Sequence, residues 1–146
     1  MLFLAFTPPV AAQGEQRPAP PPDHWLTLDS LTELVGLTAQ QRARVTEPYT
    51  ALNAVLKQAA NRRAELRAQF QRRQGGGQPG GPPPAATPEQ RARADSLRAE
   101  FQALQDEADL WHGAIRDLLM PEQQAKFDAL APPRVMGEMM RRRGGG

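Results

Sequence analysis

The sequence predicts an all-α protein built on one long antiparallel helical hairpin, and three observations lead to this prediction. Apolar residues recur at steps of three and four along two long segments, 38–74 and 87–118. A glycine- and proline-rich stretch, 75–86, separates the two segments. Residues 38–74 carry eight basic and two acidic residues, whereas 87–130 carry five basic and nine acidic residues. Two amphipathic helices with net charges of +6 and −4 are therefore expected to fold back on each other.

The composition limits the class of protein. The chain has 146 residues, with fifteen prolines, twelve glycines and no cysteine. A chain of this size forms one small core, and the missing cysteines exclude disulfides, thiolate metal sites and cysteine nucleophiles. No Ser/His/Asp set, paired catalytic carboxylates or phosphate-binding loop can be assembled from the sequence, so we expect neither an enzyme nor a cofactor.

Residues 1–12, MLFLAFTPPVAA, resemble the end of a signal peptide. They carry no charge and begin with a short apolar run, and Val10 and Ala12 fit the small-residue rule for cleavage. No basic residue precedes the run, which predicts a true start site further upstream. The sequence contains no apolar run of the roughly twenty residues that a membrane-spanning helix needs. We therefore expect a soluble protein outside the cytoplasm; the alternative is an apolar leader on a cytoplasmic protein.

The helical domain is expected to span 28–130. Proline-rich residues 13–27 are expected to form a disordered arm, with folding beginning near Trp25. Ser30 and Glu33 have the spacing of a capping box, and Gly36 should end the short helix that follows. Glycines and prolines predict a disordered hinge over 75–86, and residues 131–146 show no apolar periodicity and are expected to form a disordered tail.

The first long helix is expected over 38–74. Its heptad positions are Val45, Tyr49, Leu52, Leu56, Ala59, Leu66 and Phe70, with Arg63 in one slot. Pro48 removes one backbone hydrogen bond, but the register continues across it, which predicts a kink rather than a break. In the second long helix the positions are Ala94, Leu97, Phe101, Leu104, Ala108, Trp111, Ile115 and Leu118. A last short helix over 121–130 places Phe127 and Leu130 on one side.

One phrase occurs twice, as LTAQQ from Leu37 and as LMPEQ from Leu119. In the first copy Thr38 and Gln41 have the spacing of a capping box, and a third version of this device starts the second long helix at Thr87. The second copy has Met120 where a capping hydroxyl belongs. An antiparallel hairpin brings both copies to one end, so Leu37 and Leu119 are expected to approach each other and hold the short helices together.

These two copies resemble the motif of the LTxxQ family of periplasmic proteins, which includes Spy, CpxP and related metal-responsive proteins. The matching residues are Leu37, Thr38, Gln41, Leu119, Pro121 and Gln123. The resemblance covers 28–130 and implies a four-helix chain that dimerises into a thin, curved cradle. It further implies an ATP-independent chaperone of the envelope stress response, which holds unfolded or misfolded clients on a concave helical surface.

The first long helix offers a surface that suits this function. Its candidate client-binding residues combine positive charge with apolar groups and are Arg62, Arg63, Leu66, Arg67, Phe70, Arg72 and Arg73. Charge can attract a client over long range, and small apolar patches can then hold it weakly. The alternative is that these arginines form an ordinary solvated face that pairs with the acidic helix.

The sequence also bears on three other functions. A metal-binding or metal-sensing protein for Zn, Ni, Co or Cu would need ligands on one helix face, and only Asp109 with His112, or the methionines Met136, Met139 and Met140, offer part of a site. Because no second histidine lies nearby, His112 is expected to be a plain exposed residue and no metal site is assigned. A regulator that docks on an envelope sensor kinase would use the same basic face. Nucleic-acid binding is not expected, since no recognition motif accompanies the arginines.

Overall fold

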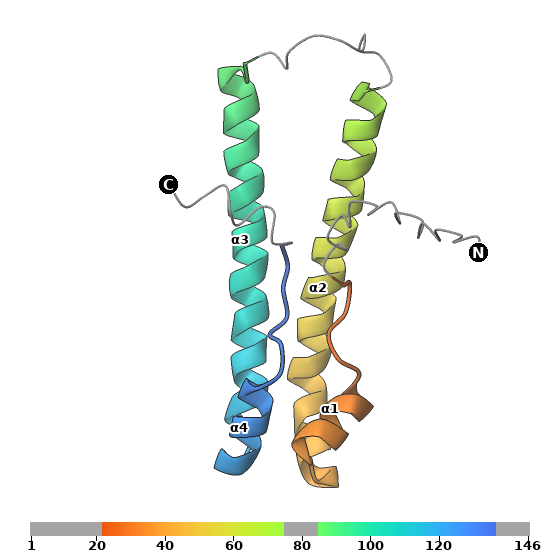
Figure 1. The fold of residues 1–146 in the computed structure, drawn as a ribbon, viewed down its shortest axis with the longest axis vertical. Coiled ribbons are helices and arrows are strands. Elements are labelled where there is room, and N and C mark those ends of the chain that lie inside the picture. Colours follow the sequence, from red (N-terminus) through yellow and green to blue (C-terminus); the bar gives the residue numbers. More distant parts are fainter. Residues whose placement is uncertain (1–21, 75–84, 137–146) are drawn as a thin grey trace, which may run out of the picture.

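The computed structural model describes residues 22–74 and 85–136, which form four helices and no strand. These are α1 (Leu28–Val35), α2 (Ala39–Gln74), α3 (Pro88–Asp117) and α4 (Pro121–Asp128). Helices α2 and α3 form a long antiparallel hairpin, and α1 and α4 lie together at one end of it (Figure 1). The predicted all-α hairpin is therefore confirmed. Residues 1–21, 75–84 and 137–146, which include the expected signal peptide and most of the expected hinge, lie outside the described residues.

Helix α2 runs for 36 residues without interruption, although Pro48 lies inside it. Proline cannot donate the backbone hydrogen bond to the residue four positions earlier. The pyrrolidine ring of Pro48 is nevertheless buried, so packing offsets part of that loss. The prediction that Pro48 does not break the helix is confirmed.

Helix α1 begins earlier than the sequence pattern predicts. Thr27 is its N-cap, and the Thr27 hydroxyl accepts a hydrogen bond from the backbone N–H of Ser30 at 3.1 Å. The predicted capping box from Ser30 to Glu33 is therefore wrong by three residues, because Thr27 already supplies the cap. Gly36 ends the helix as expected, with φ of 76°, a left-handed conformation that glycine adopts without strain.

The remaining helix starts follow the predicted capping residues. Thr38 and Gln41 exchange two hydrogen bonds of 3.0 and 3.2 Å between side chain and backbone, and Thr87 and Gln90 form the same box before α3. At α4, Gln123 accepts from the backbone N–H of Met120 at 3.0 Å, but the Met120 side chain makes no cap hydrogen bond. The second copy of the phrase is thus a half-formed capping box.

The buried core occupies only one half of the hairpin. We call this half, together with α1 and α4, the closed end; residues 62–74 of α2 and 88–100 of α3 are the open end. Core residues of the long helices are Val45, Leu52, Val55, Leu56, Ala59, Phe101, Leu104, Ala108 and Ile115, all within the closed end. Figure 1 shows the two helices moving apart towards the open end. The heptad pattern continues to Phe70, but tight packing does not.

Trp25 lies where folding was expected to begin, whereas residues 131–136 were expected to be disordered; both segments belong to the core. Trp25 is buried, and its indole N–H donates to the carbonyl of Ala131 at 3.0 Å. Residues 131–136, which we call the C-terminal strap, bury Val135 completely against the same core. The folded part therefore extends beyond the predicted limits of 28 and 130, because single anchoring side chains without any periodicity fix both segments. None of the four described helices is long and apolar enough to cross a lipid bilayer.

Candidate functional site

The open end contains the predicted client-binding residues, and they fall into two groups. Arg67, Phe70, Arg72 and Arg73 are exposed, whereas Leu66 is partly buried against the edge of the core. Phe70 is 59% exposed although it occupies a heptad position. Figure 1 shows α2 and α3 farther apart at this end than at the closed end. An aromatic side chain surrounded by arginines is therefore presented to solvent.

The other two predicted residues are engaged within the chain. Arg62 forms ion pairs with Glu65 at 3.0 Å and with Glu100 of α3 at 2.8 Å, which raise the pKa of its guanidinium. Arg63 donates a hydrogen bond to the backbone carbonyl of Val135, and burial lowers the pKa of its guanidinium. Arg62 thus matches the alternative of pairing with the acidic helix, whereas the contact of Arg63 with a backbone carbonyl of residues 131–136 was not predicted.

The open end is the positively charged end of the molecule. Residues 62–74 and 85–100 carry eight arginines and four acidic residues, a net charge of +4. The other described residues, 22–61 and 101–136, carry six basic and ten acidic residues, a net charge of −4. Arg91, Arg93 and Arg98 place exposed positive charge on α3 as well as on α2. These three residues were not among the predicted client-binding residues, because the prediction considered the first long helix alone.

The two copies of the repeated phrase meet at the closed end. The Gln41 amide nitrogen donates to the Gln123 side-chain oxygen at 2.7 Å, and Gln123 returns the bond to Gln41 at 3.0 Å. Gln123 also donates to the backbone carbonyl of Gly36 at 2.7 Å. Leu37 and Leu119 are both buried in the core beside this pair. This geometry agrees with the expectation that the antiparallel hairpin brings both copies of the phrase to one end, and we call the contact between Gln41 and Gln123 the glutamine pair.

Ion pairs fasten the short helices to the long ones near the glutamine pair. Arg116 at the end of α3 holds Asp128 of α4 with two hydrogen bonds of 2.7 and 2.8 Å, which lower the pKa of the Asp128 carboxyl group. Arg42 of α2 pairs with Asp29 of α1. These exposed pairs add orientation rather than much stability.

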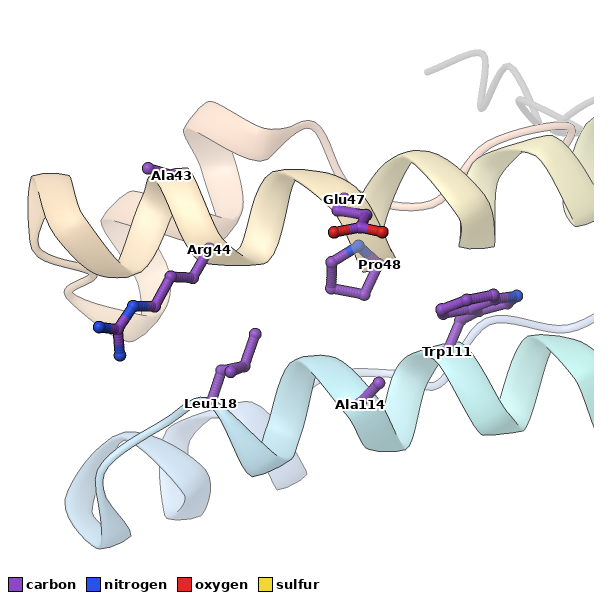
Figure 2. Close-up of a pocket in the computed structure, with 7 residues that line it drawn as sticks. All are labelled: Ala43, Arg44, Glu47, Pro48, Trp111, Ala114 and Leu118. Atoms are coloured by element: carbon purple, nitrogen blue, oxygen red, sulfur yellow. The ribbon is translucent and has the colours of Figure 1, made fainter.

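A shallow groove of about 500 Å³ lies between α2 and α3 at the closed end. Its lining comes from the two long helices alone and consists of Ala43, Arg44, Glu47, Pro48, Trp111, Ala114 and Leu118. Figure 2 shows Pro48 pointing towards α3, and Trp111 and Leu118 pointing towards α2. Neither α1, α4 nor the strap contributes to this lining, so one face of the hairpin lies uncovered at the closed end. The groove contains only one acidic and one basic side chain and no catalytic grouping.

His112 is not the plain exposed residue that the sequence predicts. Its ring packs on Phe127 with centroids 4.6 Å apart and meets the edge of Trp25 at 5.2 Å. Its Nε2 atom is buried and has no hydrogen-bond partner among the described residues. Burial lowers the pKa of the His112 imidazole, while Asp109 and Asp128 act in the opposite direction and Arg116 adds to the lowering. Local sequence patterns do not reveal this packing, because Trp25 and Phe127 lie far from His112 along the chain.

The half site that His112 and Asp109 were considered to offer a metal is committed to other contacts. The Asp109 carboxylate accepts a hydrogen bond from Gln105 at 2.9 Å, and the His112 ring lies in the aromatic cluster. Over 22–74 and 85–136, no group of three or more histidine, cysteine or acidic side chains could hold a metal ion. Met139 and Met140 lie outside the described residues.

Among the described residues, the open end combines a net positive charge with one exposed aromatic residue, Phe70. Comparison with protein-family models, with curated proteins and with solved structures finds no match to this chain.

Proposed function

We propose that this protein is an ATP-independent periplasmic chaperone that binds unfolded or aggregation-prone proteins at its open end. The observation that carries the proposal is Phe70, which is 59% exposed at a heptad position and has the exposed Arg67 and Arg73 one turn away on either side. In a purely structural hairpin this position would be filled by the facing helix. An uncovered aromatic residue among arginines fits a partner that supplies both apolar groups and negative charge.

The chemistry of the open end favours weak and reversible binding. Positive charge on both long helices would attract acidic segments before contact, and this attraction weakens as salt screens it. The apolar area is small, with Leu66, Phe70 and Leu97 spread over two helices. Since the proposed function uses no nucleotide, clients would leave when they fold and withdraw their own apolar side chains.

A second copy of the chain is the proposed partner in the assembly. Two long helices that diverge at the open end gain little from packing on each other there, although most helical stability in proteins comes from packing of an amphipathic face. The groove between α2 and α3, in which Leu118 is 39% exposed and Trp111 is partly exposed, gives a second chain an apolar surface to pack on. We therefore retain the homodimeric cradle as part of the proposal.

The test is suppression of aggregation of an unrelated reduced or heat-unfolded protein, followed by light scattering with equal molar amounts of chaperone and client. Phe70→Ser and Arg67→Glu should each weaken suppression severalfold. Leu34→Ser removes an apolar group of similar exposure at the closed end, and Lys126→Glu makes the same charge change there, so both controls should act like the original chain.

Two outcomes would contradict the proposal. If the unaltered protein leaves aggregation unchanged, it is not a chaperone, and regulation of an envelope sensor kinase becomes the better reading of the same basic face. If all four variants suppress aggregation equally well, client binding takes place elsewhere on the molecule.

A further inference from the structure

The C-terminal strap lies between the two long helices as a short non-helical segment (Figure 1). Ala131 and Pro132 each precede a proline, which restricts both to extended backbone. Pro133 and Val135 are buried, and Val135 belongs to the same core cluster as Ala59 and Phe101. The strap is therefore a non-helical peptide seated in a cleft of the hairpin, with a bend at Val135 and Met136 and with valine as its deepest side chain.

Main-chain groups of the strap form hydrogen bonds with side chains of other segments. Gln105 of α3 receives a hydrogen bond from the backbone N–H of Val135 at 2.9 Å and donates to the carbonyl of Pro133 at 3.3 Å. Arg63 of α2 donates to the carbonyl of Val135, and the Trp25 indole donates to the carbonyl of Ala131. Side chains on three separate segments thus bind backbone groups that every peptide shares.

We propose that this cleft is a binding site for an extended peptide and that the strap is its resident intramolecular ligand. The intermolecular occupant would be an extended segment of an unfolded client that places a β-branched apolar residue at the Val135 position; its identity as a client rests on the proposed function. Recognition through the main chain tolerates many sequences, and the buried valine position selects for a small apolar side chain.

The location of the cleft connects it with the open end. Arg63, which was expected to bind clients directly, instead caps the carbonyl of Val135 at the boundary between core and open end. Leu66 lies one turn further along α2 and is partly buried. A client attracted by the arginines of the open end would therefore meet the strap next. Because the strap is covalently tethered, a client must compete with a high effective concentration of it.

The experiment measures binding of a fluorescent peptide with the sequence of residues 130–136, LAPPRVM, to the full chain by anisotropy. The proteins compared are the original chain, Val135→Ala, Val135→Asp and the control Ala129→Asp. The control introduces the same charge at an exposed residue that lies before the strap. A second peptide carries Asp in place of its valine.

Loosening the strap should free the cleft for the peptide. We expect weak binding to the original chain and to Ala129→Asp, stronger binding to Val135→Ala, and binding at least about tenfold tighter to Val135→Asp. The Asp-containing peptide should not bind to any of them. The double variant Val135→Ala/Gln105→Leu should bind the peptide as weakly as the original chain does, because leucine can neither accept a hydrogen bond from the peptide main chain nor donate one to it.

The inference is overturned if the Val135 variants bind the peptide no better than the original chain, or if both peptides bind equally. Circular dichroism establishes that the helices persist, and Val135→Ala decides the question if Val135→Asp loses them. If the peptide binds but the protein does not suppress aggregation, the proposed chaperone function is wrong and the peptide-binding cleft is supported. If the protein suppresses aggregation but no variant binds the peptide, the cleft proposal is wrong and the chaperone function is supported.

Discussion

The side chains of Gln41 and Gln123 each take part in a helix start and in a contact between two helices. The side-chain oxygen of each accepts a hydrogen bond from the backbone N–H that begins its own helix, and its amide nitrogen donates to the other glutamine. A glutamate could cap the helix but could not donate, and a shorter asparagine would not span the same distance. The identity of both residues therefore follows from the contact between two helix starts that lie 82 residues apart.

Removing either glutamine should cost more than the loss of one helix cap. We expect Gln41→Ala and Gln123→Ala each to lower the free energy of unfolding by about 1–3 kcal/mol, since each removes a hydrogen bond at its own helix start together with both bonds of the half-buried glutamine pair. In urea denaturation the double variant should be less destabilised than the sum of the two, because both remove the same contact. Gln40→Ala, at an exposed neighbour, is the control. Strictly additive losses would show that the pair is not coupled.

The His112 imidazole makes stability depend on pH. Burial lowers the pKa of His112 in the folded protein below its ordinary value of about 6.5. At a pH below 6.5 the unfolded chain therefore binds the proton more readily than the folded chain does. Stability should accordingly fall as the pH drops from 7 towards 5. His112→Leu should shrink the difference between the melting temperatures at pH 7 and pH 5, measured by circular dichroism.

The Asp128 carboxyl group is the main neighbour to separate from this effect. Its pKa is lowered by Arg116, so the stability from that pair is present above the ordinary aspartate pKa and is lost only at more acidic pH. Asp128→Asn should leave most of the change between pH 7 and pH 5 in place. If His112→Leu shows the same pH dependence as the original chain, the assignment to His112 is wrong.

At the scale of elements, one periodic pattern gives two different environments. Phe70 and Phe101 both occupy heptad positions of the long helices, but Phe101 is 2% exposed and Phe70 is 59% exposed. Phe101→Ala should lower the free energy of unfolding by about 3–5 kcal/mol through lost burial and a cavity. The same change at Phe70 should cost about 0.5 kcal/mol or less, as for other surface sites. Equal losses in urea denaturation would mean that the open end is closed in solution.

The incomplete cap of α4 can be repaired. Met120 is 62% exposed and contributes no cap hydrogen bond, whereas Thr38 and Thr87 accept one from the third residue of their helices. Met120→Thr should therefore raise the free energy of unfolding by about 1 kcal/mol, the usual value of such a cap. Met120→Ala is the control, because it removes the same side chain without adding a hydroxyl. No difference between the two would show that Met120 packs usefully as it stands.

Local signals predicted the elements well, and contacts between distant segments were predicted poorly. Caps at Thr38 and Thr87 and the stop at Gly36 are encoded by neighbouring residues, so the sequence alone locates them. The strap is fixed by Gln105 and by the burial of Val135, thirty residues further along the chain, and no periodicity announces it. The start of α1 was misplaced because two residues three apart, Thr27 and Ser30, can both act as caps.

The whole molecule carries opposite net charges at its two ends, +4 at the open end and −4 elsewhere in the described residues. Two copies that pack with opposite orientations would place these ends against each other. If the proposed homodimer forms in this way, its dissociation constant should rise severalfold as the salt concentration rises from 0.05 to about 0.5 M, since the screening length falls below 10 Å. Sedimentation equilibrium measures this change. A monomer well above micromolar concentration at low salt would remove the dimer from the proposal.

The candidate site shows the same division between local and distant information. The sequence located the cationic segment of α2, because its composition is local. It could not separate Arg67, which is exposed, from Arg62 and Arg63, which bind Glu100 and the Val135 carbonyl. It also missed the contribution of α3, where arginines are interspersed with acidic residues and the net charge of the segment is negative. Which arginines face solvent depends on how α2 and α3 are placed relative to each other, and the sequence pattern does not contain that information.

The glutamine pair has a consequence for how the chain could be divided. Residues 22–74 and 85–136 each contain one short helix, one long helix and one copy of the repeated phrase, and the core and the glutamine pair join the two parts. Separately expressed fragments ending at Gln74 and starting at Ala85 should therefore find each other and restore the fold, as in a split reporter. The chain is therefore organised like two different subunits that are joined by one covalent linker.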